Sequence, residues 1–235
     1  MKTMGIAAAL AALVSAGATP AFAQTTESGY LGTPVRAPKN AFELGVNTGY
    51  TQGFGALTRR VPLGSLAGPG FAAGLDLGYR VSPGFSIGVA GQYQGFSASS
   101  ALPTGTVVRG ASVDLQGTLH GAPYSRVDPF VTIGAGYRAL WEVPTGIAPT
   151  IMTHGFELAK LQLGLDLRVS ESVAIAPVIG AGVDMFVWEN TEGAETAQLR
   201  NRGASGFVFA GVQGRFDHGG ARACKPAVVT QTQIE

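Results

Sequence analysis

The feature that most constrains this chain is a period-two alternation of apolar residues with small or polar ones, which recurs from residue 41 onward. In residues 71–81, Phe, Ala, Leu, Leu, Tyr and Val take the odd positions, and Ala, Gly, Asp, Gly and Arg take the even ones. Because successive side chains of a strand point to opposite faces, this alternation predicts β-strands with one apolar face. The segments are about 8 to 15 residues long, whereas strands of soluble proteins usually have about 5 to 6 residues. Eight segments show the pattern: residues 42–50, 71–81, 85–93, 112–119, 130–141, 156–169, 173–187 and 207–216.

The second face of these strands distinguishes between two kinds of barrel. A soluble ligand-binding barrel would hide its apolar face inside and show charge to water. Here the face opposite the apolar one holds Gly, Ser, Asp, Gln and Arg, which suit a crowded polar interior. Hydrocarbon outside and a packed polar lumen inside explain both faces, since in lipid a closed barrel pairs every strand backbone group.

The connections between the segments alternate in length. Four are long (residues 51–69, 97–106, 142–155 and 189–206) and three are short (82–84, 121–128 and 170–172). Short periplasmic turns and longer extracellular loops are typical of outer-membrane barrels. We therefore predict an all-β fold, an eight-stranded antiparallel up-and-down transmembrane β-barrel, with both termini in the periplasm.

The N-terminus predicts export. Lys2 precedes an uncharged stretch at residues 5–18, and a small-x-small cleavage site stands at residues 21–23, as in a secretory signal peptide. Beyond residue 23, no uncharged apolar run approaches the ~18 residues of a transmembrane helix. The expected organisation is a signal peptide at 1–23, a periplasmic N-terminal segment at 24–40, the barrel at 41–217 and a periplasmic C-terminal tail at 218–235.

The composition excludes several classes of protein. Charged residues make up 13% of the chain, about half the share that is usual in soluble domains. The formal net charge of +1 gives no electrostatic footprint for nucleic acid. The single cysteine, Cys224, excludes an intramolecular disulfide framework and a cysteine-rich metal site.

The end of the last segment supports a family resemblance. This segment ends Gly214-Arg215-Phe216 and also carries Phe207 and Phe209. With the signal peptide and eight amphipathic strands, the layout resembles the small eight-stranded outer-membrane barrels of the OmpA-like transmembrane family. The resemblance implies a Gram-negative outer-membrane location, contact with outer-membrane lipid and lipopolysaccharide, and insertion by the barrel-assembly machinery. The tail is too short for the peptidoglycan-binding domain that some relatives carry.

The inward-facing charges are the one constellation of candidate functional residues. A narrow barrel lumen makes an unpaired charge costly, so their balance predicts structural ion pairs, with a polar relay or conduit as the alternative. We expect Arg215, Glu43 and Arg80 to meet near one end, and Arg138, Lys160 and Asp184 near the other, one carboxylate facing two cations in each group. The ten inward charges are Glu43, Asp76, Asp114, Asp166 and Asp184, and Arg80, Arg138, Lys160, Arg168 and Arg215.

Pro177 is harder to place. It falls on the apolar face in the middle of the seventh segment, where it removes a donor from the strand ladder. A β-bulge there, or a register that slips by one residue, is the expected remedy.

Three functions remain open from the sequence. The first is a structural or surface-interaction barrel whose loops contact an unknown partner, the second a small porin-like channel, and the third a lipid-modifying enzyme. His120, His154 and His218 lack the spacing of metal ligands. A rim pair of His154 with a serine of the loop at 97–100 is the one enzymatic arrangement to seek. We expect no enzyme, no cofactor and no metal site, and a function of the first kind.

Overall fold

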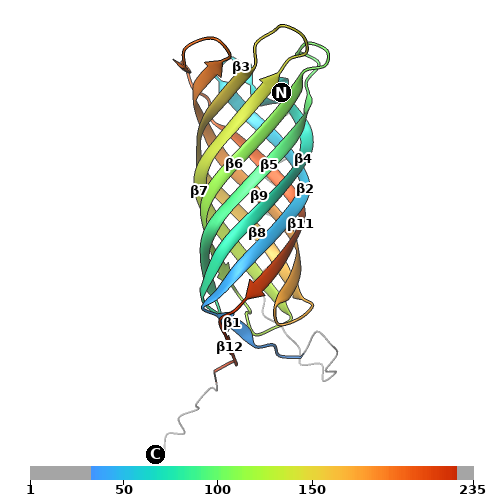
Figure 1. Cartoon of the computed structure of the whole chain (residues 1–235), viewed down its shortest axis with the longest axis vertical. Helices are drawn as coiled ribbons and strands as arrows, with labels where there is room; N and C mark the ends of the chain where they lie inside the picture. The colour runs from blue at the N-terminus through green and yellow to red at the C-terminus, as the bar shows by residue number, and fades with distance from the viewer. Residues whose placement is uncertain (1–32, 227–235) are drawn as a thin grey trace, which may run out of the picture.

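The computed structural model describes residues 33–226 of the chain. Within this range eight long strands form one closed barrel, seen from the side in Figure 1. None of the helices in the described residues is long and apolar enough to span a membrane. The expected signal peptide lies outside the described residues, as do parts of the segments that flank the barrel. The barrel strands are β2 (Ala41–Thr58), β4 (Ala67–Ser82), β5 (Phe85–Ala98), β6 (Val107–His120), β7 (Val127–Val143), β8 (Ile151–Arg168), β9 (Val173–Thr191) and β11 (Ser205–His218).

The barrel closes because its last strand pairs with its first. β11 pairs antiparallel with β9 on one side and with β2 on the other. Every neighbouring pair from β2 to β9 is also antiparallel. Closure pairs both edges of every barrel strand, as a β-structure in lipid requires. The predicted eight-stranded up-and-down barrel is confirmed.

The burial pattern is the reverse of that in a soluble protein. On β4, Leu75 and Leu77 are each 58% exposed on the outer wall, whereas Arg80 is fully buried in the lumen. A band of exposed apolar side chains of this size is stable against hydrocarbon, so the strands cross a membrane. The band continues around the wall with Val46, Val89, Val113, Leu115, Ile133, Leu161, Ile179 and Val212.

The long connections are shorter than predicted. Residues 51–55, expected in a loop, continue β2 and pair with β11. Strand pairing therefore extends past the apolar band, because the ladder still satisfies backbone groups where the side chains turn polar. The remaining loops at this end cover residues 59–66, 99–106, 144–150 and 192–204, and the turns at the other end cover 83–84, 121–126 and 169–172. We call these the loop end and the turn end of the barrel.

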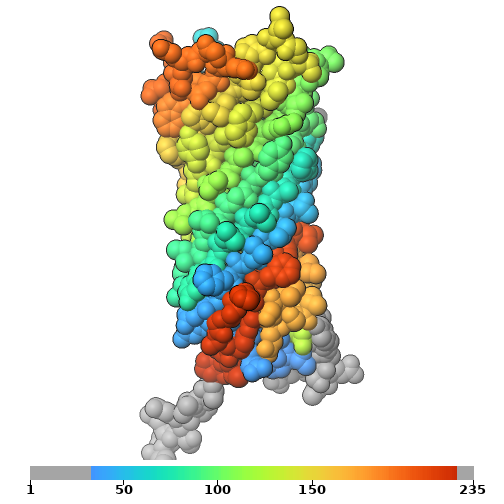
Figure 2. All heavy atoms as spheres, in the orientation of Figure 1, coloured from blue at the N-terminus to red at the C-terminus, as the bar shows by residue number. Residues whose placement is uncertain are grey.

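Short elements close both ends. At the loop end, β3 (Val61–Pro62) pairs with β2, η2 (Leu63–Ser65) follows, and β10 (Ala197–Gln198) pairs with β9. In Figure 2 the end of β9 and the loop after it rise as an orange group at this end. At the turn end, β1 (Ala37–Lys39) pairs with β12 (Ala221–Ala223) beneath the barrel (Figure 1). Ala37 is fully buried there, so the flanking segments cover the turn end.

One β-bulge turns a charged side chain into the lumen. The register between β8 and β9 shifts between Glu157 and Ala159, and Leu158 and Ala159 both face outward. Such a bulge places an extra residue on one strand and rotates the next side chains to the other face. Glu157 consequently points into the lumen, where it is buried.

Pro177 causes no such shift. On the β8 side, the pairs Gly164–Val178 and Leu167–Ile175 belong to one register. On the β11 side, the pairing passes through Pro177 without a break. Around Pro177 the ladder to β8 has a gap, but the pairs on either side of the gap share one register. The expected bulge or register slip at Pro177 is therefore wrong.

Cysteine labelling tests the orientation of the barrel. Thr196→Cys lies in the exposed loop at 192–204 and Ser170→Cys in the exposed turn at 169–172, each in a Cys224→Ser background. An impermeant maleimide added to whole cells should label the first variant and spare the second, because short turns face the periplasm. Labelling of the second variant alone would reverse the orientation.

Candidate functional site in the barrel lumen

The lumen is filled by polar side chains in successive layers along the barrel axis. On β8 the charged and amide side chains that face inward are, from the turn end upward, Arg168, Asp166, Gln162, Lys160 and Glu157. Side chains from the other strands complete three groups at these levels. We call the three groups the turn-side cluster, the amide layer and the loop-side cluster. The turn-side cluster contains Glu43, Arg80, His120, Asp128, Asp166, Arg168, Arg215 and Asp217; the amide layer contains Asn47, Asp76, Gln116, Gln162 and Gln213; the loop-side cluster contains Gln94, Asp114, Arg138, Glu157, Lys160 and Asp184.

Three arginines of the turn-side cluster each meet a carboxylate. Arg80 Nε lies 3.3 Å from Glu43 Oε1, and Arg215 Nη1 lies 2.5 Å from Asp166 Oδ2. Arg168 Nη1 lies 3.3 Å from a carboxylate oxygen of Asp217. Removing such charges from water is costly unless each is paired, and the pairing makes this end of the lumen a network of ion pairs.

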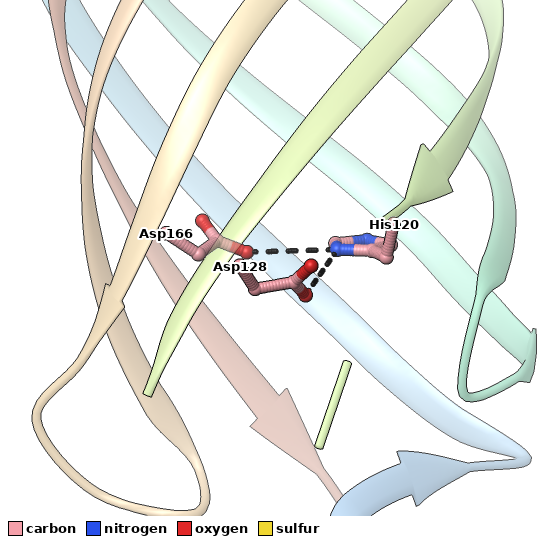
Figure 3. A group of neighbouring side chains, drawn as sticks. All are labelled: His120, Asp128 and Asp166. Atoms are coloured by element: carbon pink, nitrogen blue, oxygen red, sulfur yellow. Dashed lines mark hydrogen bonds and ion pairs between the residues drawn. The ribbon is translucent and has the colours of Figure 1, made fainter. Parts of the chain in front are cut away.

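Figure 3 shows His120 of β6, Asp128 of β7 and Asp166 of β8 facing one another in this cluster. Their potential ligand atoms lie within 4.8 Å of one another, close enough to hold a metal ion. Arg215 Nη1, however, also lies 3.3 Å from His120 Nε2. Because arginine only donates hydrogen bonds, Nε2 is the acceptor. The ring hydrogen of neutral His120 therefore sits on Nδ1, which donates to Asp128 Oδ2 at 2.9 Å.

These hydrogen bonds compete with a metal for the same ligand atoms. A metal would need the lone pair of His120 Nδ1, which carries the hydrogen, and Asp166 Oδ2, which already accepts from Arg215. The other oxygen of Asp128 accepts from the backbone N–H of Ala122 at 2.8 Å. The donor set fits a hydrogen-bonded chain that ties the turn at 121–126 to the lumen.

In the amide layer, one carboxylate is held by amides alone. Asp76 Oδ2 accepts from Asn47 Nδ2 at 3.0 Å and from Gln213 Nε2 at 3.1 Å. Its other oxygen accepts from Gln116 Nε2 at 3.2 Å. Gln213 in turn accepts from Gln162 Nε2 at 3.0 Å. The expectation that Asp76 takes part in an ion pair is wrong, because three amide donors take the place of a cation.

Arg138 is the centre of the loop-side cluster. Its guanidinium donates to Asp184 Oδ1 at 2.8 Å, to Glu157 Oε2 at 2.7 Å and to Gln94 Oε1 at 2.7 Å. The Phe207 ring covers the guanidinium, with 4.3 Å from Cζ to the ring centroid, a cation–π geometry. Arg138 is thus held on several sides in a space that leaves little room for movement.

Lys160 pairs across the lumen with a different carboxylate. Its Nζ lies 2.9 Å from Asp114 Oδ2 of β6, two strands away. The expected contact of Lys160 with Asp184 is therefore wrong, although Arg138 does contact Asp184. The expected ratio of one carboxylate to two cations is also wrong here, since Arg138 contacts two carboxylates.

At the turn end the structure likewise regroups the expected charges. Glu43 and Arg80 meet, but the direct partner of Arg215 is Asp166. Four buried ionisable members of the two clusters are absent from the ten expected charges. They are His120, Asp128, Glu157 and Asp217.

Three of the four omissions have a definable cause. Asp128 lies two residues before the expected segment at 130–141, and Asp217 lies two residues after Arg215, the last inward charge of the final segment. Extending the alternation by two residues in each segment would have placed both carboxylates on the inner face. Glu157 carries no such signal, because only the bulge at Leu158 turns it inward.

An apolar layer lies between the loop-side cluster and the outer mouth. It contains Leu57, Leu63, Ala67, Phe96, Val108, Leu140, Phe186 and Phe207, all buried. Leu63 comes from η2, so the loop at 59–66 folds inward to complete the layer. Beneath it, the two cavities lined by the polar clusters measure about 30 and 20 Å³, each enough for roughly one water molecule. Side chains therefore fill the lumen along its length.

Comparisons with known proteins support the fold. Neither a protein-family model nor a curated protein matches the sequence. The structure is similar to that of the outer membrane protein OprG from Pseudomonas aeruginosa, with 9% identity, a TM-score of 0.51 and coverage of 78% of this chain and 99% of that one. Neisserial surface protein A gives 14% identity, a TM-score of 0.49 and coverage of 73% and 95%. Ail of Yersinia pestis gives 14% identity, a TM-score of 0.41 and coverage of 74% and 98%.

The class of protein follows from the fold and the burial pattern together. The described residues form a closed antiparallel barrel of the kind found in small outer-membrane proteins. Its outer wall is an apolar band and its lumen is polar. The chain has the fold of a small eight-stranded outer-membrane β-barrel, and its apolar band crosses a membrane.

The buried pair of Glu43 and Arg80 can be tested by stability. Glu43→Gln should lower the urea midpoint of the detergent-folded barrel, because breaking a buried ion pair costs about 3 to 5 kcal/mol. Glu192→Gln is the control, since Glu192 is exposed in a loop and accepts a hydrogen bond from the backbone of Thr150. Equal midpoints for the two variants would show that the Glu43 carboxylate is solvated.

The hydrogen-bonded state of His120 predicts indifference to metals. The unfolding midpoint of the folded barrel should be the same with a chelator and with added Zn²⁺, because the Nδ1 hydrogen and Arg215 occupy the ligand positions. A midpoint that falls with chelator in the wild type, but not in His120→Gln, would establish a metal at this site.

Proposed function

We propose that this protein acts as a closed outer-membrane barrel with a structural or surface-interaction role. Its contacts with other molecules are made by the loops and the outer wall. The observation that carries the proposal is the filled lumen: charged and amide layers leave cavities of about 30 Å³ or less in it, and an apolar layer lies above them.

The porin-like alternative needs a continuous aqueous path. Opening one would require Arg138 to leave its three acceptors and Phe207 to swing out of the apolar layer. Each freed carboxylate or guanidinium would then lose charge-assisted hydrogen bonds in a confined space. These costs favour a barrel that stays closed.

The enzymatic alternative has little support in the contacts of its candidate residues. His154 faces outward and contacts the Tyr137 hydroxyl through Nδ1, and its ring stacks on Trp188. Ser97 Oγ donates to the carbonyl of Pro69 at 2.7 Å. These partners give the expected rim residues roles in the wall and the loops, and they favour a non-enzymatic protein.

Single-channel recording tests the proposal. The purified barrel in planar bilayers should give no conductance steps, because every layer of the lumen must open together for ions to pass. The double variant Arg138→Ser/Phe207→Ser removes two large lumen side chains and serves as the opened comparison, with heat-modifiable gel mobility to confirm folding. If the wild-type barrel gives conductance steps as large as those of the double variant, the proposal is overturned in favour of a channel.

A further inference from the structure

One neighbouring pair of barrel strands has no chain connection between its members. Within residues 33–226, every other pair around the barrel is joined by a loop or a turn, from the loop at 59–66 to the loop at 192–204. Such a connection keeps two strands close together, because the chain between them limits how far they can separate. The closing seam, at which β11 pairs with β2, depends on non-covalent contacts alone.

The short ribbon of β1 and β12 continues this seam. His218 of β11 pairs with Phe42 of β2. Three residues further along both chains, Ala221 pairs with Lys39, so the register is the same on both sides of the bend between them. We call residues 35–39 and 221–223 the strap.

The bend that turns the strap beneath the barrel depends on left-handed backbone. Asn40, Gly219 and Gly220 have φ values of 54°, 70° and 68°, a region that glycine and asparagine adopt most readily. At Gly220, an added Cβ would lie 2.4 Å from the carbonyl oxygen of Lys39. These residues direct the ribbon to a position beneath the barrel (Figure 1).

The strap is anchored on both sides of the barrel mouth. Arg222 donates from Nη1 to the carbonyl of Glu171 and from Nη2 to Ser172 Oγ, each at 2.7 Å, in the turn between β8 and β9. The N–H of Val35 donates to the carbonyl of Tyr124 at 3.0 Å, in the turn between β6 and β7. That turn lies opposite the seam, because β4 and β5 intervene on one side and β8 and β9 on the other. The N-terminal arm of the strap therefore crosses the mouth from wall to wall.

The strap closes the lumen at the turn-side cluster. Its residues Ala37 and Pro38 are buried, and Arg80, near the turn end of β4, is fully buried as well. An ion pair is stronger where water is excluded. Closure by the strap therefore strengthens the pairing of Arg80 with Glu43, which links β4 to β2.

We propose that the strap is a hinged closure of the turn end that also holds the β2–β11 seam together. It moves as a unit about Asn40 and the pair Gly219–Gly220. In the closed position it joins the first and last barrel strands, as a turn joins the other pairs; in the open position it admits water to the turn-side cluster while the barrel stays folded. The inference goes beyond the proposed function, because it concerns the turn end and does not depend on the apolar layer at the loop end.

Hydrogen exchange of the detergent-folded barrel, measured by mass spectrometry, tests the proposal. Arg222→Gln removes the anchor on Glu171 and Ser172. It should raise the exchange rates of the strap and of the adjoining seam, residues 42–46 and 214–218, about tenfold, and leave β5 and β6 unchanged. Lys39→Gln makes the same change in charge at an exposed position of β1 and should leave the exchange rates as in the wild type.

A disulfide across the strap supplies the complementary test. The pairing of Ala37 with Ala223 places position 36 opposite Cys224, and facing residues of antiparallel strands are close enough for a disulfide. Arg36→Cys/Arg222→Gln should therefore regain the wild-type exchange of the seam when oxidised and lose it when reduced. The same variant with Cys224→Ser is the control and should not respond to oxidant.

Gly220→Ala is a second variant, which strains the bend and leaves the anchors in place. Wild-type exchange of the seam in both Arg222→Gln and Gly220→Ala would overturn the proposal, because the strap would then cover the mouth without holding the seam. An equal rise of the exchange rates in β5 and β6 would also overturn it, since the whole barrel would then be destabilised. A conducting wild-type barrel whose seam still depends on Arg222 would refute only the closed lumen.

Discussion

The interaction on which this structure depends is the backbone hydrogen bonding of strands in a medium that offers no other partner. In hydrocarbon an unpaired N–H or C=O is costly, so a strand must be paired on both edges. The pairing of β11 with both β9 and β2 meets this condition for the whole set. It also explains why the strands continue past the apolar band, and why Pro177 is tolerated where the ladder on either side keeps one register.

Closure with eight strands makes the lumen narrow, and the narrow lumen determines its chemistry. An interior just wide enough for side chains leaves charges little water, so each must find a partner among the others. Packing is equally tight where apolar rings enter: Phe130 lies against Gly164 of β8, where an added Cβ would come within 2.2 Å of the ring. The Arg215 guanidinium lies 4.5 Å from the centroid of the same ring. The lumen is therefore packed as tightly as the core of a soluble protein, but with paired polar side chains.

Because the lumen is filled, the outer wall and the loop end are the surfaces available for contact with other molecules. The outer wall is uniformly apolar, but it is not featureless, because small residues leave grooves between the large ones. At the loop end, exposed arginines follow β2 and precede β11, and Glu195 stands in the same loop as Arg200 and Arg202.

The sequence by itself determined the features that depend on local periodicity alone. Alternation identified the eight strands and which face of each is apolar, and it assigned Glu43, Arg80 and Asp184 to the inner face, because the direction of a strand side chain depends only on its position in the pleat. The partners of these charges were decided by the tertiary structure. Lys160 meets Asp114 across two strands, Arg215 of β11 meets Asp166 of β8, and Glu157 enters the lumen through a bulge. Such contacts depend on the tilt, stagger and closure of the whole barrel, which bring together strands that are not neighbours in the ladder, and no pattern within a single strand contains that information.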